Sequence, residues 1–196
     1  MGWQVHCLVR NKDKLLVHDP LMTVFEGNPN HLEELKPAMK GCHNVISVLN
    51  ISRNSDFPWS PLCTPKTYLS DVMQNLIKAC NVLGIKRVVL CSAWGVGETW
   101  HQVPFWFKAT IKYSNIRFAY KDHERQEGLL EDTPLDWTIV RPVGLVNFKK
   151  RKAVTAITPD KAPPGWLISR SDLALYFLET VTETINFKKK LTVSWA

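Results

Sequence analysis

The feature that most constrains the fold of this chain is a short, almost continuous apolar run, Val88-Val89-Leu90-Cys91, which lies between Arg87 and Ser92. A β-branched run without polar alternation is typical of a strand whose two faces are both covered. Strands of this kind occur in parallel sheets. We therefore expect a parallel sheet with helices on both of its faces.

Segments that resemble strands and helices alternate along the rest of the chain. Apolar runs predict strands at residues 5–9, 21–25, 44–49, 137–141 and 191–193. Helical spacing of apolar residues predicts helices at residues 31–39, 68–83 and 120–130. Ser169 with Asp172 resembles a capping box before a further helix. This alternation predicts an α/β fold built on a doubly wound parallel sheet.

Composition narrows the class of protein. The 196 residues, 45% of them hydrophobic, suit one domain with an adequate core. No run approaches the roughly 18–20 uncharged apolar residues of a membrane span, and no signal peptide is recognisable, so we expect a cytoplasmic location and no membrane partner. The five cysteines form no C-x-x-C pair and the six histidines have no metal-ligand spacing, so we expect no metal.

The net charge of +7 is concentrated in two runs, at residues 149–152 and 188–190, each beside a predicted strand. Aromatic residues are not interleaved with these lysines and arginines, and no nucleic-acid-binding motif is present. We therefore expect solvated loops and no nucleic-acid partner.

The order of several segments resembles a known family. Residues 38–42 precede the strand at 45–49; residues 84–92 are followed by Gly95; residues 122–127 lead to 135–142; and residues 168–174 close the set. Together they resemble the atypical short-chain dehydrogenases/reductases, the NAD(P)-binding NmrA-like and flavin (biliverdin) reductase-like proteins. The resemblance extends from about residue 3 to the C-terminus and implies a Rossmann-like fold.

Members of that group open with a strand, a glycine-rich turn and a helix, which precede the strand resembling residues 5–9. No such unit is found here, and Gly95-Val96-Gly97 lacks the third glycine and a helix opening. We therefore expect residues 1–196 to form one Rossmann-like domain that is truncated at its N-terminus, lacking a first βα unit of about twenty residues. A native start upstream of Met1 is preferred over a genuine short form. In the strand order 3-2-1-4-5-6 the missing strand would be central.

The resemblance implies a cofactor site. Arg10 ends the first strand, where an acidic residue would favour NAD and an arginine favours the additional phosphate of NADP. Arg10, with Asn11 and Lys12, therefore favours NADP, unless the three form only an exposed basic turn. Asn28 follows Gly27 where relatives carry an adenine-contacting aspartate; the alternative is a simple turn.

Further cofactor contacts are expected where strands end. Leu49 and Asn50 follow a strand beside the switch point of the sheet, although Leu49 would equally serve as packing. Pro142 and Val143, followed by Gly144, occupy the place where relatives bring backbone against the nicotinamide.

The catalytic residues depart from the family pattern. Ser92 matches the serine that holds a substrate carbonyl, although it would equally cap a turn. Alignment of the Y-x-x-x-K motif puts Ala119 at the tyrosine position and His123 at the lysine position, and Tyr120 lies about 100° away around the helix. His123 would donate a hydrogen bond or proton near neutral pH, or would only lie on the helix surface.

An aromatic group lies in the insertion after Ser92. Its members would form a wall for a flat substrate such as a quinone or flavin, or would only extend the core. They are Trp100, Phe105, Trp106 and Phe107.

Three functions follow from these observations. The first is an NADPH-dependent reductase of a flat small-molecule acceptor such as a quinone or flavin. The second, favoured by the missing tyrosine, is a non-catalytic NADP sensor that changes its association with a protein partner. The third is an inactive truncated form.

Overall fold

The structure is a computed structural model that describes residues 2–15, 17, 19–162 and 165–196. A five-stranded sheet forms its centre, with strand order β3-β4-β5-β9-β7. The first four strands are parallel, and β7 is antiparallel to β9. The strands span Asn44–Ser47 (β3), Arg87–Cys91 (β4), Asp136–Pro142 (β5), Lys189–Trp195 (β9) and Val154–Ile157 (β7).

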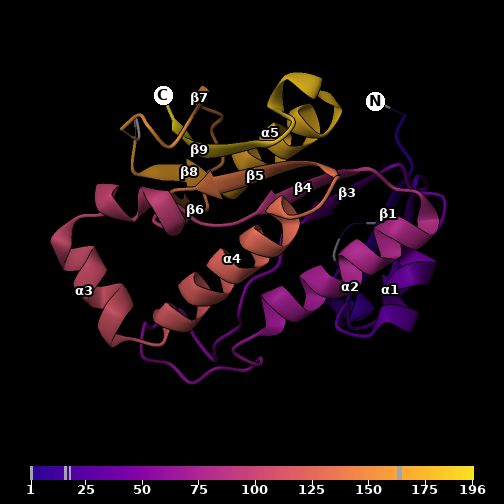
Figure 1. The fold of residues 1–196 in the computed structure, drawn as a ribbon, viewed down its shortest axis with the longest axis horizontal. Coiled ribbons are helices and arrows are strands. Elements are labelled where there is room, and N and C mark those ends of the chain that lie inside the picture. The colour runs from indigo at the N-terminus through magenta and orange to yellow at the C-terminus, as the bar shows by residue number, and fades with distance from the viewer. Residues whose placement is uncertain (1, 16, 18, 163–164) are drawn as a thin grey trace.

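Helices cover both faces of this sheet (Figure 1), as the continuous apolar run of β4 predicts. In the ribbon, α2 and α4 lie on one side and α5 on the other. The helices span Leu32–Met39 (α1), Tyr68–Leu83 (α2), Phe105–Tyr113 (α3), Ile116–Glu131 (α4) and Arg170–Thr182 (α5). The α/β Rossmann-like class is therefore confirmed.

Successive side chains of β4 point to opposite faces of the sheet and pack in two separate core clusters. Val88 and Leu90 pack in one cluster with residues of α2, whereas Val89 packs in a second cluster with residues of α5. All three have no exposed surface. Since successive side chains of a strand point to opposite faces, a buried strand of this kind requires apolar residues at every position.

Two small ladders complete the fold. β1 (Val5–Val9) pairs in parallel with β2 (Met22–Glu26), and β6 (Gly144–Val146) pairs in parallel with β8 (Leu167–Ser169). Within the described part of the chain, β1 and β2 form a sheet of their own and β1 is not hydrogen-bonded to β3. The absence of a first βα unit stays a prediction.

Helix α2 has the predicted bounds, and it ends at Gly84, whose φ of +71° is the left-handed conformation that stops a helix. Ser169 caps α5 as predicted, because its Oγ accepts a hydrogen bond from the Asp172 amide. Helix α4 begins at Ile116 rather than at Tyr120. α3 has no counterpart among the predicted helices.

The basic run at residues 188–190 is a solvated loop only in part, because Lys188 and Lys189 are exposed whereas Lys190 is partly buried. β9 begins at Lys189, and the Lys190 Nζ lies 2.6 Å from a carboxylate oxygen of Glu131. The carboxylates of α4 and η2 (Gly97–Gln102) stabilise a lysine at the start of the strand. None of the described helices is long and apolar enough to cross a bilayer.

Candidate active site

A cavity of about 500 Å³ lies where three parallel strands, β3, β4 and β5, end. In open α/β sheets, ligands bind in the crevice beyond the carboxyl ends of the strands. Its lining comes from all three strand ends, from α3 and α4, and from the ladder of β6 and β8. The lining includes Asn50, Arg53, Ser92, Trp94, Trp106, Phe107, Ala119, Tyr120, His123, Pro142, Val143 and Trp166.

Ser92 stands at the end of β4 and is only 4% exposed. Its amide donates a 2.7 Å hydrogen bond to the Val140 carbonyl, which fixes the backbone. Its Oγ has no hydrogen-bond partner among the residues described. A buried hydroxyl without a partner is costly unless a ligand or water completes it. Ser92 therefore offers a polar group in the cavity wall, and its role towards a substrate stays a prediction.

Helix α4 supplies a second wall through Ala119, Tyr120 and His123, whose i, i+1 and i+4 positions all border the cavity. The offset of Tyr120 from the family position therefore does not remove it from the cavity. The Tyr120 hydroxyl donates to the Trp94 carbonyl at 3.1 Å, and burial raises the pKa of this phenol. Its proton is engaged in the protein, which makes Tyr120 a poor proton donor.

His123 lies at the expected lysine position and is buried, not on the helix surface. Burial lowers the pKa of its imidazole to about 4, so the ring is neutral at neutral pH. The Nδ1 atom lies 2.6 Å from the Gln126 amide nitrogen. When that amide donates, the neutral ring carries its proton on Nε2. His123 then serves as a hydrogen-bond donor and not as an imidazolium acid.

Aromatic rings form a third wall. Trp106 stacks on Trp166 with ring centroids 6.2 Å apart and planes 7° apart, and Trp94 meets Trp166 edge-on at 6.0 Å. Of the predicted aromatic group, Trp106 and Phe107 line this cavity. Trp100 lines a neighbouring cavity and Phe105 is 84% exposed, so the predicted wall includes only half of that group.

Trp94 and Trp166 were not among the candidates from the sequence. Trp166 reaches the cavity through the parallel pairing of Gly144 with Leu167, and the Gly144 amide donates to the Trp166 carbonyl at 2.9 Å. This contact joins segments that are more than twenty residues apart in the sequence. The local sequence around Trp166 therefore does not predict that it lines the cavity.

The residues predicted for the adenosine end of a cofactor lie around the end of β1. The Arg10 Nη2 lies 3.4 Å from the Ser52 Oγ, and Ser52 precedes Arg53, which lines the cavity. The Arg53 Nε is buried without a partner in the described chain. Arg10 is therefore linked through Ser52 to the loop that brings Arg53 to the cavity.

Several predicted contacts have local roles. The Asn11 Oδ1 accepts from the Asp13 amide at 2.8 Å, and the Asn28 Oδ1 accepts from the Asn30 amide at 3.1 Å, so each closes a turn. The Lys12 amide donates to a Glu26 carboxylate. These bonds fix the turns that follow β1 and β2.

The strand-end contacts divide between cavity and core. Asn50 borders the cavity, although its Oδ1 is engaged by the Ile51 amide at 2.8 Å. Leu49 packs against the cluster that contains Ile51, as the packing alternative predicts. Pro142 and Val143 border the cavity at the end of β5.

A family model described as NAD(P)H-binding matches residues 1–184. The chain belongs to this NAD(P)H-binding family. Among curated relatives, the chain is 28% identical over 167 residues to an uncharacterised sugar epimerase, YhfK, of Bacillus subtilis, covering 84% of this chain and 67% of that protein. It is 27% identical over 192 residues to the oxidoreductase nsrR of Aspergillus novofumigatus, covering 92% and 69%.

Solved structures share the fold. A short-chain dehydrogenase/reductase of Veillonella parvula in complex with NADP matches with a TM-score of 0.69 at 19% identity, covering 90% of this chain and 73% of that one. ChuY, an anaerobillin reductase of Escherichia coli, matches with a TM-score of 0.67 at 19% identity, covering 88% and 74%.

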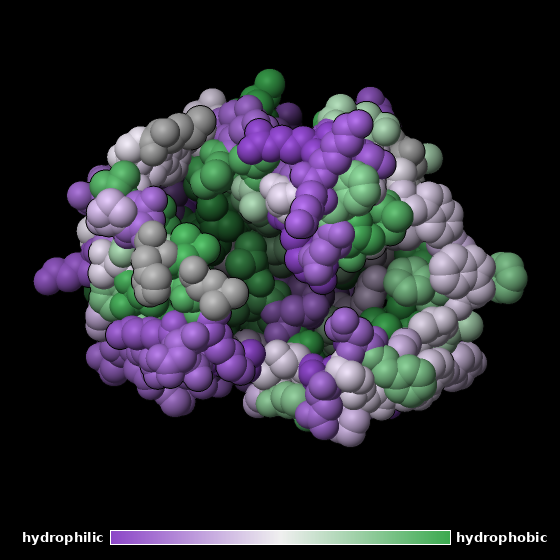
Figure 2. All heavy atoms as spheres, turned by 180° about the vertical axis from the view of Figure 1, so that it is seen from behind, coloured by the Kyte–Doolittle hydropathy of each residue, from purple (hydrophilic) through white to green (hydrophobic). Residues whose placement is uncertain are grey.

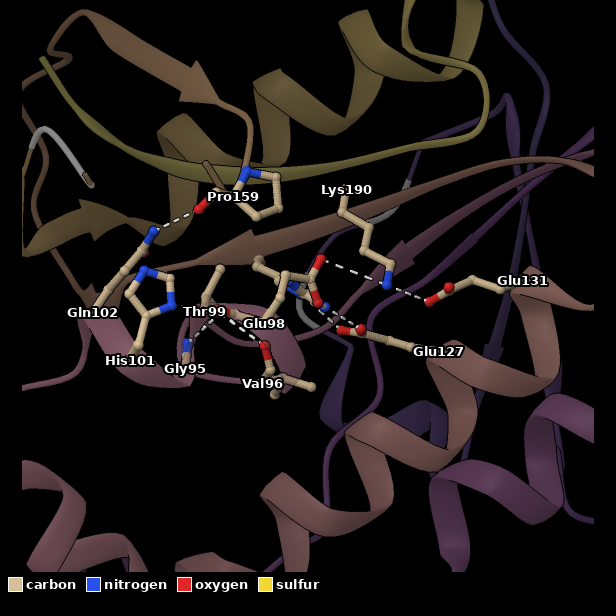
Figure 3. Close-up of polar contacts among 11 residues, drawn as sticks. Gly95, Val96, Glu98, Thr99, His101, Gln102, Glu127, Glu131, Pro159 and Lys190 are labelled. Carbon is tan, nitrogen blue, oxygen red and sulfur yellow. Dashed lines mark hydrogen bonds and ion pairs between the residues drawn. The ribbon is translucent and has the colours of Figure 1, made fainter. Parts of the chain in front are cut away.

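The described residues of this NAD(P)H-binding chain fit a nicotinamide cofactor in part. The Arg53 Nε and the Ser92 Oγ, which have no hydrogen-bond partner within the described chain, are suitable for polar groups of a dinucleotide. The Gly95-Val96-Gly97 turn is not suitable for a diphosphate. The Gly95 amide donates to the Thr99 Oγ1 at 2.9 Å, so its N–H is already engaged (Figure 3).

Charged residues hold the segment that follows Ser92. Glu98 lies between Lys190, at 3.5 Å, and Arg141, at 3.0 Å, and Lys190 also contacts Glu131 (Figure 3). Arg141 has no exposed surface, and its Nε donates to Glu127 at 3.0 Å. Burial opposes the charge of Arg141, but the two carboxylates outweigh burial and raise its pKa.

The same segment is anchored at its far end. The Gln102 Nε2 donates to the Pro159 carbonyl at 2.8 Å (Figure 3). The Gln102 Oε1 accepts a hydrogen bond from the Trp94 indole at 3.0 Å. The network therefore fixes the turn that carries Trp94 and limits its motion over the cavity.

Proposed function

We propose that this NAD(P)H-binding protein is a reductase that transfers a hydride from NADPH to a flat small-molecule acceptor such as a quinone or flavin. The observation that carries the proposal is the cavity itself, which is lined by the buried Ser92 hydroxyl and by the parallel indoles of Trp106 and Trp166. Among the described residues that hydroxyl has no hydrogen-bond partner. A flat ring stacks on such a wall, and a carbonyl of that ring takes the hydroxyl hydrogen bond.

When bound, the reduced nicotinamide supplies the hydride. The protein positions the acceptor between Trp166 and α4, and the Ser92 hydroxyl donates to the acceptor oxygen as negative charge develops there. Neutral His123 donates a further hydrogen bond through Nε2. Tyr120 keeps its proton on the Trp94 carbonyl, and water supplies the proton that completes reduction.

Support for the class of reaction comes from the family and from two relatives. The curated relative of Aspergillus novofumigatus is described as an oxidoreductase, and ChuY as an anaerobillin reductase. The substrate named for ChuY is not proposed for this chain. We extend only the class of reaction, a reduction, from ChuY to this chain. We further propose a cytoplasmic location and a small-molecule substrate.

The experiment is a steady-state assay of NADPH oxidation by the purified chain with a panel of quinones and flavins. We expect Ser92→Ala to lower kcat by about 10²-fold, because one donor to a developing oxyanion is removed. Ser60→Ala, which changes a buried serine outside the cavity, is the matched control. Tight NADPH binding without turnover of any acceptor would reject the reductase.

One observation favours a second function, a non-catalytic NADP sensor. Ala119 occupies the position of the family tyrosine, and the neighbouring Tyr120 hydroxyl is engaged by the protein. A sensor requires binding but no proton donor. Pull-downs with and without NADPH distinguish the two proposals: a sensor retains different protein partners in the two samples, whereas identical partner profiles exclude it.

A further inference from the structure

We infer that a second cavity, between η2, α3 and α4, binds a planar aromatic anion, that is, a flat ring system carrying a carboxylate or a phosphate. This cavity lies beside the candidate active site and is separate from it. The inference does not depend on the proposed reductase activity.

The first observation is the cavity itself. Its volume is about 520 Å³, which is within the range of small-molecule sites. In Figure 1, α3 and α4 diverge from the turn that joins them, and the cavity is lined by residues of both helices. Its remaining walls come from the turn at residues 95–97 and from Trp100 of η2. The cavity therefore has room for a ligand of two or three fused rings.

Helix α4 presents neighbouring stripes of side chains to two different cavities. Ala119 and His123 border the candidate active site. Arg117, Lys121 and Glu124 border the second cavity. Because a helix turns by about 100° per residue, positions 117, 121 and 124 form one stripe, beside the stripe that contains 119 and 123. A ligand in the second cavity therefore contacts a different face of α4 from a ligand in the first.

Tyr120 is the wall that the two cavities share. Its hydroxyl donates to the Trp94 carbonyl at 3.1 Å, which fixes the ring at one end. A Cβ atom at Gly95 would lie only 3.2 Å from the Tyr120 Cε1, so the ring packs against the Gly95 backbone. The phenol ring therefore separates the two cavities at this point.

Three cations converge on the second cavity, Lys112 from α3 and Arg117 and Lys121 from α4. None of the three forms an ion pair with another residue of the described chain. Among the described residues that line the cavity, Glu124 is the only acid, and it is exposed. A cavity with an excess of one sign of charge concentrates ions of the opposite sign, so this one attracts an anion.

The start of α4 adds to the positive potential. Arg117 lies in the first turn of this helix, which contains no acidic residue to offset the positive end of the helix dipole. The Arg117 Nη1 donates to the Ser114 carbonyl at 3.0 Å, and its Cζ lies 4.4 Å from the centroid of the Phe118 ring. The guanidinium is therefore held in place beside the cavity, and an anion there offsets both the cation and the dipole.

The other walls of the cavity are suitable for an aromatic body. Val96 and Ile111 are buried and apolar, and the Trp100 indole is 39% exposed. A flat ring packs well against an indole. The view from behind shows a hollow with hydrophobic walls (Figure 2), whereas this cavity combines apolar walls with three cations. A purely apolar ligand would leave these cations without a partner, so the matching ligand is aromatic and anionic.

The test is isothermal titration of the 196-residue chain with 2-naphthoate and with 2-naphthyl phosphate. We expect one of the two anions to bind about tenfold or more tightly than uncharged 2-naphthamide, and the tighter anion identifies the preferred charged group. Saturating NADPH should leave the affinity unchanged, because the cavities are separate. Raising NaCl from about 50 to about 500 mM should weaken binding of the anion but not of the amide.

Two pairs of variants locate the site. Lys121→Gln should weaken binding of the anion about fivefold or more, whereas Lys78→Gln, at an exposed lysine of α2 outside the cavity, should not. Trp100→Leu should weaken binding to a similar extent, because the ring loses its stacking surface. Phe105→Leu, at an 84% exposed ring that borders neither cavity, is its control.

Four outcomes overturn the inference. The first is no binding of either anion at millimolar concentration, and the second is equal binding of the uncharged amide. The third is displacement of the anion by NADPH, which would place the anion in the cofactor groove. The fourth is equal weakening by Lys121→Gln and Lys78→Gln, which would mean that only the net charge of the protein attracts the anion.

Discussion

At the scale of single residues, the buried imidazole of His123 in the cavity wall makes the free energy of unfolding depend on pH in the acid range. Its pKa is about 4 in the folded protein and about 6.5 when unfolded. The unfolded state therefore binds the proton more readily between these values. Stability that is complete above pH 6.5 is lost as pH falls towards 4.

We expect His123→Gln to flatten this dependence. The free energy of unfolding of the wild type should fall by on the order of 3 kcal/mol more than that of the variant between pH 7 and pH 4, because a shift of one pKa unit is worth about 1.4 kcal/mol. Urea titrations at several pH values measure it. His101→Gln, at an exposed histidine, is the control, and equal slopes for His123→Gln and the wild type would contradict the prediction.

Arg10 carries the expected preference for NADP. We predict that Arg10→Glu shifts the ratio of NADPH to NADH affinity by at least tenfold towards NADH, because a carboxylate accepts from a ribose hydroxyl and repels a phosphate. Isothermal titration with both cofactors measures the ratio. Lys14→Glu makes the same charge change four residues further along, in the 3₁₀ helix Lys12–Lys14, and is the control. If both variants change the ratio equally, the effect comes from the overall positive charge of this surface and not from a direct contact of Arg10 with the cofactor.

At the scale of the elements, buried charge joins α4 to β5. Glu127→Ala would leave Arg141 in the interior with only the partly exposed Glu98, so we expect a loss of about 3–5 kcal/mol in the free energy of unfolding. Glu131→Gln, which breaks only a partly exposed pair with Lys190, should cost under about 1 kcal/mol. Urea unfolding compares them.

The double variant Glu127→Leu with Arg141→Met removes both buried charges. It should recover most of the stability lost in Glu127→Ala, because a buried pair is replaced by apolar packing. A double variant as unstable as the single one would mean that shape, not charge, determines the effect.

Comparison of the individual elements shows which parts of the fold could be predicted from the sequence. α2 was predictable at its bounds because its apolar stripe is regular and Gly84 ends it. α3 was missed because its aromatic residues are largely exposed and give no clear face, as the 84% exposure of Phe105 illustrates. Ser92 was found because it ends the most strongly apolar strand.

Other parts of the candidate site were not predictable from local pattern. Trp166 depends on the pairing of β6 with β8, and Arg53 on a loop that approaches the cavity from β3. The environment of His123 was also beyond the sequence, because its depressed pKa arises from burial among distant segments. Such contacts depend on tertiary structure, about which the secondary-structure propensities of the residues contain no information.

At the scale of the whole molecule, the separate ladder of β1 and β2 predicts uneven stability. Amides of residues 88–90 and 139–140, in strands with neighbours on both sides, should exchange slowest. Amides of β1 should exchange at least 10²-fold faster, because only one of its two edges is paired with a strand of the described chain. Native-state hydrogen exchange measures both rates, and uniform protection would contradict the prediction.

The indole cluster at the cavity gives the molecule a built-in optical probe. Three of its eight tryptophans, Trp94, Trp106 and Trp166, border the space where a reduced nicotinamide would bind. Their emission overlaps the absorption of such a ring, so resonance energy transfer from these side chains would report occupancy in unlabelled protein. A chromophoric acceptor bound beside the same rings would quench them as well.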